Sequence, residues 1–305
     1  MSGGVTVRVP AKVNVQLAVG AARPDGFHDL ANVFLAVSLY DEVTVTPAEA
    51  LTVTCSGPDA DQVPLDRTNL AARAAQILAS RAGLSDSVHL HIAKNIPVAG
   101  GMAGGSADGA AALLACDALW GLGTPVEDLL AICAELGSDV PFSLVGGAAL
   151  GTGRGELLTP VEAGTFHWVF AVADGGLSTP AVFREFDRLA ADREVPVPQA
   201  SPALLAALAS GDPDALAATL ANDLQPAALS LRPQLARTLD AGTSAGALAG
   251  LVSGSGPTTA FLVRDPESAL KVAAALEASG TCRTTRVATS PAEGATVLRP
   301  TTASR

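Results

Sequence analysis

The chain has 305 residues, and 30 acidic residues against 19 lysines and arginines give it a net charge of −11. Hydrophobic residues make up 49% and charged residues 16%, which excludes a disordered chain and a coiled coil. The acidic balance repels nucleic acid and anionic lipid, so neither is expected as a partner. Four widely spaced cysteines without a CxxC pair predict buried thiols in a reducing, cytoplasmic compartment.

Two segments bear on a membrane location. The longest uncharged stretch, residues 241–263, is interrupted by Gly, Ser, Thr and Pro, so it predicts buried turns and a strand and not a membrane span. The first residues, MSGGVTVRVPAK, lack the apolar segment of a secretion signal. We therefore expect a cytoplasmic protein.

Alternating apolar residues predict strands through the first 55 residues. Val43 and Val45 face Leu51 and Val53 across a turn at residues 47–50, which predicts a hairpin. Apolar periodicity then predicts these elements in order: a helix over 69–81, a strand over 88–92, an alanine-rich helix over 106–120 and a helix over 126–136 that ends at Gly137.

The second half of the chain begins after a change in composition near residues 159–165. It predicts a strand over 167–173, a helix from Thr179, a Pro/Ala-rich connector over 195–202, a helix before Gly242, a strand over 260–263 and a helix over 267–279. Strands and helices mix without regular alternation, which predicts an α+β protein of two lobes, residues 1–160 and 161–305.

A glycine loop at residues 97–106 follows one predicted strand and precedes a helix. Backbone N–H groups and a helix N-terminus then surround one point, which suits a phosphate group. The alternative is a tight connection whose glycines only allow close packing. The loop is neither a P-loop, because no lysine follows the last glycine, nor a GxGxxG dinucleotide motif.

Two other motifs favour different chemistry. Residues 242–246 fit the GxSxG pattern of hydrolases, but a helix is predicted before them and a strand after them, the reverse of what that pattern needs. His89 and His91 share one strand face, where two metal ligands would lie, but no third ligand is near in sequence. A hydrolase is therefore not favoured, and the two histidines are interpreted as an ordinary strand pair.

Four segments in order resemble the signature motifs of the GHMP kinases: residues 11–14 (AKVN), 97–106, 136–141 (LGSDVP) and 252–257 (VSGSGP). The segments RPDGFH and NDL, which end at His28 and Leu224, are similar to those of the branch that phosphorylates a cytidine-diphosphate-linked methylerythritol. The resemblance implies an N-terminal lobe like ribosomal protein S5 domain 2 and a ferredoxin-like C-terminal lobe. It also implies ATP with Mg²⁺ in the cleft and phosphorylation of the 2-hydroxyl, a step of non-mevalonate isoprenoid biosynthesis.

Lys12 and Asp139 are the candidate catalytic residues. As plain sequence, Lys12 would be a solvated strand residue beside Asn14, and Asp139, which precedes Pro141, would cap a helix. The resemblance implies instead that Asp139 is the catalytic base, that Lys12 stabilises developing charge, and that Asn14 contacts the substrate.

An aromatic pair, Phe27 and His28, stands out in a polar loop, because aromatic residues make up only 4% of the chain. Without the resemblance they would be a loop anchor and a surface histidine. With it, Phe27 stacks on cytosine and His28 binds the polar edge of the base. Phe183 would cover the other face of the base, unless it belongs to the core, and Thr179 would contact a substrate phosphate.

The remaining candidates bind ATP or line the substrate. The resemblance places Asn69 and Lys94 near adenine, although they could be a helix-start Asn and an exposed strand Lys. Ser106 is a phosphate contact, an N-cap or both. Asp108 is interpreted as a charge in the first helical turn. No residue is identified as a ligand of Mg²⁺. The phosphate loop supplies Pro97, Gly100, Gly101, Gly104, Gly105 and Ser106, and the substrate wall Gly254, Ser255 and Gly256, which could also be only a turn.

Two alternatives remain open. The first is another GHMP kinase, of the homoserine or mevalonate type, but such a substrate would leave Phe27 and His28 without a base to bind. The second is a non-catalytic nucleotide-binding protein of the same fold, which would not need both Lys12 and Asp139. Met102 and Ala103 depart from the family pattern in the loop. We expect a monomer or homodimer.

Overall fold

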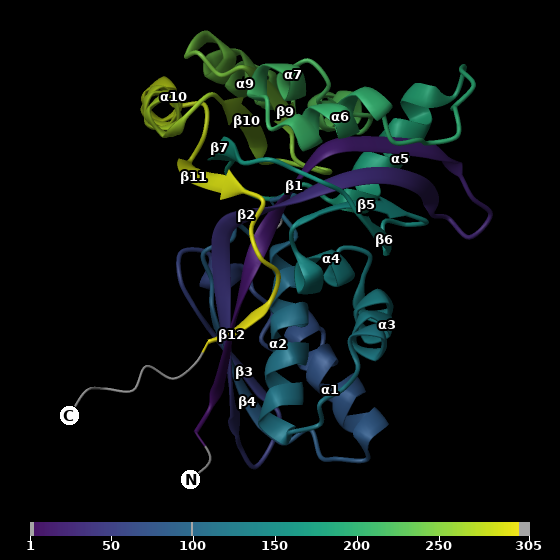
Figure 1. The fold of residues 1–305 in the computed structure, drawn as a ribbon, viewed down its shortest axis with the longest axis vertical. Helices are drawn as coiled ribbons and strands as arrows, with labels where there is room; N and C mark the ends of the chain where they lie inside the picture. The colour runs from purple at the N-terminus through teal and green to yellow at the C-terminus, as the bar shows by residue number, and fades with distance from the viewer. Residues whose placement is uncertain (1–2, 99, 299–305) are drawn as a thin grey trace.

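The computed structural model describes residues 3–98 and 100–298. Two sheets lie one above the other in Figure 1, each with helices packed against it. The first sheet contains eight strands: β1 (Val5–Ala22), β2 (His28–Pro47), β3 (Thr52–Ser56), β4 (Val88–Ala93), β5 (Ala148–Thr152), β6 (Leu157–Pro160), β8 (Ala221–Asn222) and β12 (Thr296–Leu298). Its main order is β12-β1-β2-β4-β3, with β5 beside β2 and β8 beside β1.

Helices cover one face of this sheet (Figure 1). They are α1 (Leu70–Ala82), α2 (Gly104–Trp120), α3 (Val126–Leu136) and α4 (Val140–Val145), and a short 3-10 turn η1 (Ala60–Gln62) lies near β3. Helix α2 lies between β1 and β2 on one side and α1 on the other. Small buried residues such as Ala107, Ala110 and Ala111 let its backbone approach the strands closely.

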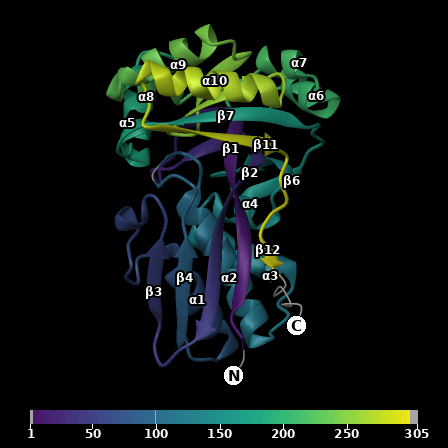
Figure 2. The same cartoon turned by 90° about the vertical axis from the view of Figure 1, so that its left-hand side faces the viewer.

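The second sheet has the order β11-β7-β10-β9 and is antiparallel throughout. Its strands are β7 (Phe166–Val172), β9 (Ala249–Val252), β10 (Thr259–Val263) and β11 (Thr284–Ser290). The helices of this half are α5 (Thr179–Ala190), α6 (Pro202–Ser210), α7 (Pro213–Ala217), α8 (Gln225–Leu231), α9 (Gln234–Ser244) and α10 (Pro266–Ser279). Figure 2 shows α10 lying along this sheet, above the upright strands of the first.

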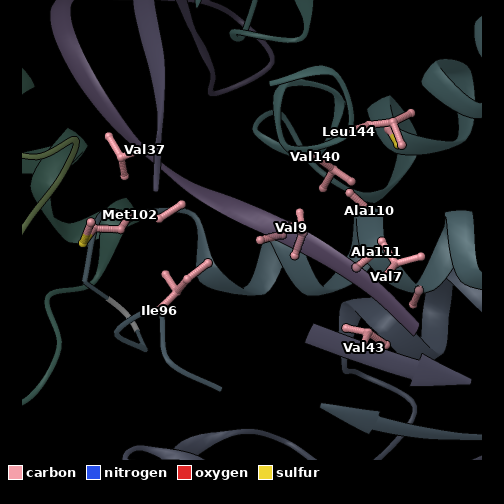
Figure 3. Close-up of a cluster of buried hydrophobic side chains, with 14 of the residues drawn as sticks. Val7, Val9, Val37, Val43, Ile96, Met102, Ala110, Ala111, Val140 and Leu144 are labelled. Carbon is pink, nitrogen blue, oxygen red and sulfur yellow. The ribbon is translucent and has the colours of Figure 1, made fainter. Parts of the chain in front are cut away.

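The main core lies between the first sheet and α2 (Figure 3). Val7 and Val9 of β1 and Val43 of β2 point toward α2, and all three are fully buried. Met102, which precedes α2, is also fully buried, so this departure from the family pattern packs in the core and does not face solvent. The same cluster extends to Trp168 and Phe170 of β7, so the apolar core is continuous between the two sheets.

The predicted α+β, two-lobed class is confirmed, and most predicted elements are present within two residues of their expected ends. The predicted hairpin between residues 43–45 and 51–53 is wrong. β3 does not pair with β2, because β4 lies between them and pairs antiparallel with β2 and parallel with β3. Alternation fixes which face of a strand is buried but not which strand lies beside it.

Residues 241–263 contain turns and the predicted strand, β10, together with the last residues of α9 and the strand β9, which the sequence did not predict. Throughout residues 3–98 and 100–298, no helix is long and apolar enough to cross a bilayer. Two short strands from the second half of the chain, β8 and β12, pair with β1. The division at residue 160 remains a prediction.

Candidate active site

A cavity of about 820 Å³ brings together segments from both halves of the chain. Its lining includes fifteen of the candidate residues: Lys12, Asn14, Phe27, His28, Gly100, Gly101, Gly104, Gly105, Ser106, Asp139, Thr179, Phe183, Gly254, Ser255 and Gly256. Asn69 and Lys94 line a smaller cavity of about 160 Å³. Pro97 is buried behind Gly100 and is not among the lining residues of either cavity.

Lys12 is buried at the centre of the large cavity wall, where its side chain is only 5% exposed. Its Nζ donates to Oδ1 of Asn14 at 2.5 Å and to the carbonyl oxygen of Gly101 at 2.9 Å, and it lies 3.7 Å from Oδ2 of Asp139. Asn14 in turn donates to Asn32 at 2.7 Å. Burial lowers the pKa of Lys12, and the charge of Asp139 only partly opposes this effect. The solvated-strand interpretation of Lys12 is therefore wrong.

Asp139 lies between α3 and α4, at the position that precedes the first residue of α4. Its side chain makes no capping hydrogen bond to that helix, and about a third of it is exposed in the cavity. The geometry leaves this carboxylate free to meet a ligand, because its nearest charged neighbour is Lys12 and its helix does not use it.

The glycine loop leads directly into α2, whose first turn faces the cavity. No side chain caps this helix, since the residue before it is Ala103, with φ +61°. Ser106 lies inside the first turn, so it is not the N-cap, and it lines the cavity. The N–H groups of Gly104 and Gly105 have no hydrogen-bond partner within residues 3–98 and 100–298, and together with the positive end of the helix dipole they suit a phosphate group.

The segment Gly254-Ser255-Gly256 forms the opposing wall. Gly254 has φ +56°, and a Cβ there would lie 3.1 Å from Nζ of Lys12 and 3.2 Å from the carbonyl oxygen of Gly101, so glycine suits both the backbone conformation and the close approach. Oγ of Ser255 lies 2.8 Å from Oγ1 of Thr179, the first residue of α5. One helical turn further, Phe183 lies on the same face of α5. The wall therefore continues from Lys12 through Ser255 and Thr179 to Phe183.

Aromatic rings form the next part of the cavity. Phe183 packs on His28 with ring centroids 4.9 Å apart. The imidazole of His28 is buried, and its Nε2 lies 2.8 Å from Oδ1 of Asp187. Phe27 is 49% exposed, which is unusual for a phenylalanine and leaves its ring accessible to a ligand.

Sequence reasoning missed two of these residues, Arg154 and Asp187. The guanidinium of Arg154 lies 5.2 Å from the ring centre of Phe27, and its Nε contacts Glu156. The only signal for Arg154 was its position between two glycines in the connection from β5 to β6. Asp187 carried no signal, because its partner His28 is 159 residues away.

Asn69 behaves as the plain sequence predicts. It caps α1, with its Oδ1 accepting from the N–H of Ala71 at 2.8 Å and its Nδ2 donating to the carbonyl of Pro64 at 2.7 Å. These two bonds hold the amide in place, and one N–H of Nδ2 remains for another contact. Asn69 also lines the small cavity.

Lys94 is not an exposed strand residue, since its side chain is 2% exposed. Its Nζ donates to Oδ2 of Asp41 at 2.5 Å and to Oδ2 of Asp108 at 2.7 Å. Burial acts to lower the pKa of Lys94, but Asp108 and Asp41 outweigh it and raise that pKa. Asp108 is the fifth residue of α2 and is 3% exposed, so the interpretation as a charge in the first helical turn is wrong.

The two competing motifs remain without support. Residues 242–244 end helix α9, and a Cβ at Gly242 would collide with the ring of Phe261, so the segment is a packed helix end and not a strained elbow. His89 and His91 bond to Thr52, Thr54 and Ser56 of the neighbouring strand. In the part of the chain that the structure describes, no group of three His, Cys, Asp or Glu side chains could hold a metal ion.

The chain matches the GHMP kinases N terminal domain over residues 69–147 and the GHMP kinases C terminal domain over residues 204–282. It is 76% identical to the 4-diphosphocytidyl-2-C-methyl-D-erythritol kinase of Streptomyces avermitilis, over 96% of this chain and 99% of that protein. Identity to the enzyme of that name from Mycobacterium tuberculosis is 56%, over 97% and 94% of the two chains.

Solved structures of GHMP kinases resemble this chain as well. A crystal structure of 4-(cytidine 5'-diphospho)-2C-methyl-D-erythritol kinase is 32% identical, with a TM-score of 0.77 over 94% of this chain and 99% of that one. Homoserine kinase from Cytophaga hutchinsonii shares the fold, with a TM-score of 0.74 at 20% identity over 98% of both chains. The chain therefore belongs to the GHMP kinase family, and its curated relatives of 56–76% identity carry the name 4-diphosphocytidyl-2-C-methyl-D-erythritol kinase.

Proposed function

We propose that this kinase transfers the γ-phosphoryl group of ATP to the 2-hydroxyl of 4-diphosphocytidyl-2-C-methyl-D-erythritol, in non-mevalonate isoprenoid biosynthesis. The observation that carries the proposal is that one cavity joins Phe27, His28 and Phe183 to Lys12 and Asp139. Homoserine or mevalonate would leave the aromatic residues without a base to bind. A non-catalytic protein would have no use for a free carboxylate 3.7 Å from a buried ammonium group.

Asp139 acts as the catalytic base. It accepts the proton of the 2-hydroxyl while that oxygen bonds to the transferred phosphorus and the bond to the leaving ADP breaks. Lys12 holds Asp139 in place and stabilises the negative charge that develops on the phosphoryl group between the attacking 2-hydroxyl oxygen and the leaving oxygen of ADP. Asn14 and the carbonyl of Gly101 fix the position of the Lys12 ammonium.

The phosphate chain of ATP would lie against Gly104, Gly105 and Ser106, where the uncapped end of α2 offers N–H donors. The first turn of α2 has room for the phosphates. A Cβ at Gly105 would meet only Leu70, 4.0 Å away, so this glycine leaves open space for a ligand. Mg²⁺ accompanies ATP and neutralises charge on its phosphates; we propose that the phosphates themselves supply most of its ligands.

The cytidine base would lie on the exposed ring of Phe27, with Phe183 near it and His28 at its polar edge. Asp187 fixes the orientation of the His28 ring through Nε2, which leaves Nδ1 for other contacts. Thr179 and Ser255 lie between the base and Lys12, a position that suits the diphosphate or the erythritol.

We also propose that the enzyme works in the cytoplasm as a monomer or homodimer, with no nucleic acid as partner. All four cysteines are unpaired, which fits a reducing compartment. The net charge of −11 opposes binding to polyanions.

Coupled ADP release with Mg-ATP tests the assignment. Four reactions run in parallel: with 4-diphosphocytidyl-2-C-methyl-D-erythritol, with homoserine, with mevalonate and without an acceptor. Only the first is expected to stimulate ADP release. Stimulation by homoserine or mevalonate alone would refute the substrate, and no stimulation in folded protein that binds ATP would favour the non-catalytic alternative.

The role of Asp139 is tested in the same assay. Asp139→Asn is expected to lower turnover by about 10²-fold or more, because the amide cannot accept the proton. Its affinity for ATP should stay close to that of the wild type. Near-normal turnover would remove Asp139 from the role of base.

A further inference from the structure

The segment Asn222-Asp223-Leu224 is similar to a family motif, but the proposed mechanism gives it no role. Its first residue lies in β8, which pairs in parallel with β1, the strand that carries Lys12. Asn222 does not line the large cavity but contacts the backbone of the wall formed by residues 254–256. These contacts show what the segment holds in place.

The side-chain amide of Asn222 joins three backbone groups. Its Nδ2 donates to the carbonyl oxygens of Val252 and Gly254, at 2.7 and 2.8 Å. Its Oδ1 accepts from the N–H of Leu224 at 2.9 Å. A primary amide has two N–H donors, so the two carbonyls use both of them. Asn222 therefore fixes the backbone at the start of the wall.

The neighbouring residue anchors the segment to β1. The carboxylate of Asp223 accepts from the N–H of Val19 at 2.9 Å, and its own N–H donates to the carbonyl of Leu17 at 2.9 Å. Leu224 is buried in one apolar cluster with Leu17 and Val19. The amide of Asn222 thus connects the wall, which belongs to the second half of the chain, to the first strand.

Gly254 is the part of the wall that lies against Lys12. A Cβ at Gly254 would lie 3.1 Å from Nζ of Lys12 and 3.2 Å from Oδ1 of Asn14. The wall also contacts the phosphate loop, because Oγ of Ser253 donates to the carbonyl of Gly101, which accepts from Lys12 as well. The side chain of Lys12 is only 5% exposed, so a displaced wall would admit water to its ammonium group.

We propose that Asn222 is a positioning residue for phosphoryl transfer: its amide holds Gly254 against Lys12 and Asn14, and so closes the wall over the ammonium group. The inference rests on the proposed function only in taking Lys12 as the group that stabilises the developing charge. An ammonium group shielded from water acts more strongly on that charge than a hydrated one, so a closed wall favours the transfer.

The protonation of Lys12 reports whether the wall is closed. Burial is the largest cause of its lowered pKa. Asp139, between α3 and α4, is the charged group that faces Lys12 among the residues described, while β2 contributes the uncharged ring of Phe34 and the loop before α2 the carbonyl of Gly101. If the wall opens, water stabilises the ammonium form, so the pKa of Lys12 rises.

Competitive acetylation follows this titration without turnover. Lys12, Lys94 and Lys271 are the only lysines in the chain, so mass spectrometry can follow each in its own peptide. Trace acetic anhydride reacts with the unprotonated amine. The midpoint of the rate against pH therefore gives the pKa of Lys12, and the plateau at high pH gives its accessibility. Lys271 is 70% exposed and serves as the reference, and Lys94, which is 2% exposed, shows whether the fold is kept.

Asn222→Leu removes both donors and keeps a side chain of similar size. The midpoint for Lys12 should rise, and its plateau rate should increase by about threefold or more, while Lys94 stays protected. Coupled ADP release should show turnover lowered by about tenfold or more. Asn222→Asp keeps the acceptor for Leu224, but its carboxylate cannot donate, so it should change Lys12 in the same direction.

Gln16→Leu is the matched control. Nε2 of Gln16 donates to the carbonyl of Gln199 and its Oε1 accepts from the N–H of Ser201, both at 2.8 Å, so this variant also removes an amide that joins β1 to distant backbone. Gln16 does not line the large cavity. Urea unfolding should show both leucine variants destabilised, but Gln16→Leu should keep the wild-type midpoint and plateau of Lys12.

A wild-type midpoint and plateau for Lys12 in folded Asn222→Leu would overturn the inference. Equal changes in Gln16→Leu would overturn it too, since general destabilisation would then explain them. If Asn222→Leu does not fold, Asn222→Asp decides. The acetylation needs no acceptor substrate. A wild type that released no ADP with the cytidylyl acceptor would therefore refute the proposed function, while the acetylation of Lys12 would still decide the role of Asn222.

Discussion

Gly101 is the position where a single added methyl group should disturb the site most. Its φ is +75°, and a Cβ there would lie 2.1 Å from the carbonyl oxygen of Ser253. The obstacle is backbone, which cannot rotate away as a side chain can. The carbonyl oxygen of Gly101 also accepts from Lys12 at 2.9 Å and from Oγ of Ser253 at 3.0 Å, so a displaced loop carries these contacts with it.

Two costs follow from Gly101→Ala. The left-handed backbone alone costs an alanine about 1–2 kcal/mol. Relief of the collision requires a separation of about 1 Å between the loop and Ser253, since interiors are closely packed and tolerate no such contact. A misplacement of about 1 Å at a catalytic group can lower turnover by about 10²-fold.

Gly83→Ala is the matched control, because Gly83 has φ +65° and a Cβ there meets nothing within 4 Å. It shares the backbone cost but not the collision. Urea unfolding should show both variants destabilised, Gly101→Ala more so, and coupled ADP release should show a loss of about 10²-fold in Gly101→Ala alone. If folded Gly101→Ala turned over within about threefold of Gly83→Ala, the argument that loop position controls Lys12 would be refuted.

Two further predictions concern the substrate base and the pH profile. Phe27→Ala is expected to raise KM for the cytidylyl substrate by about tenfold, because one base-stacking contact is lost, and to leave KM for ATP unchanged. Phe27→Tyr, which keeps the ring, should leave both KM values unchanged. An equal rise in both KM values in Phe27→Ala would contradict the stacking role. Because burial lowers the pKa of Lys12, its ammonium form is lost at a lower pH than in a free lysine, so turnover should fall on the alkaline side. In Lys12→Arg this alkaline loss of turnover should be absent, since arginine stays charged. If the turnover of Lys12→Arg fell with rising pH as that of the wild type does, a group other than Lys12 would be responsible.

How much of the site the sequence predicts depends on how local its chemistry is. Phosphate binding by a glycine loop needs only neighbouring N–H groups and a helix start, so the sequence alone predicts residues 97–106 as one phosphate-binding segment. Lys12 and Asp139 were named by motif, but their approach to 3.7 Å joins positions 127 residues apart and depends on the whole first lobe.

Lys94 shows why the rest was out of reach. Lys94 directly follows β4, whose side chains alternate, so the sequence indicates that its side chain points away from that of Ala93. The sequence does not indicate that a carboxylate 53 residues upstream and another 14 residues downstream enclose it. The wrong hairpin has the same origin, because β4 enters between β2 and β3 from 32 residues beyond β3. Pairing over such distances is decided by packing that no local pattern contains.

The strand β12 also has a consequence for folding during synthesis. Thr6 and Arg8 of β1 pair with Leu298 and Thr296, so a segment that is synthesised early waits for a partner almost 300 residues further along the chain. Until β12 leaves the ribosome, that stretch of β1 is an open strand edge. Contacts between residues so far apart in sequence form slowly, because a long loop must close before they are made. A nascent copy would thus complete its first sheet only after nearly all of the second sheet has been synthesised.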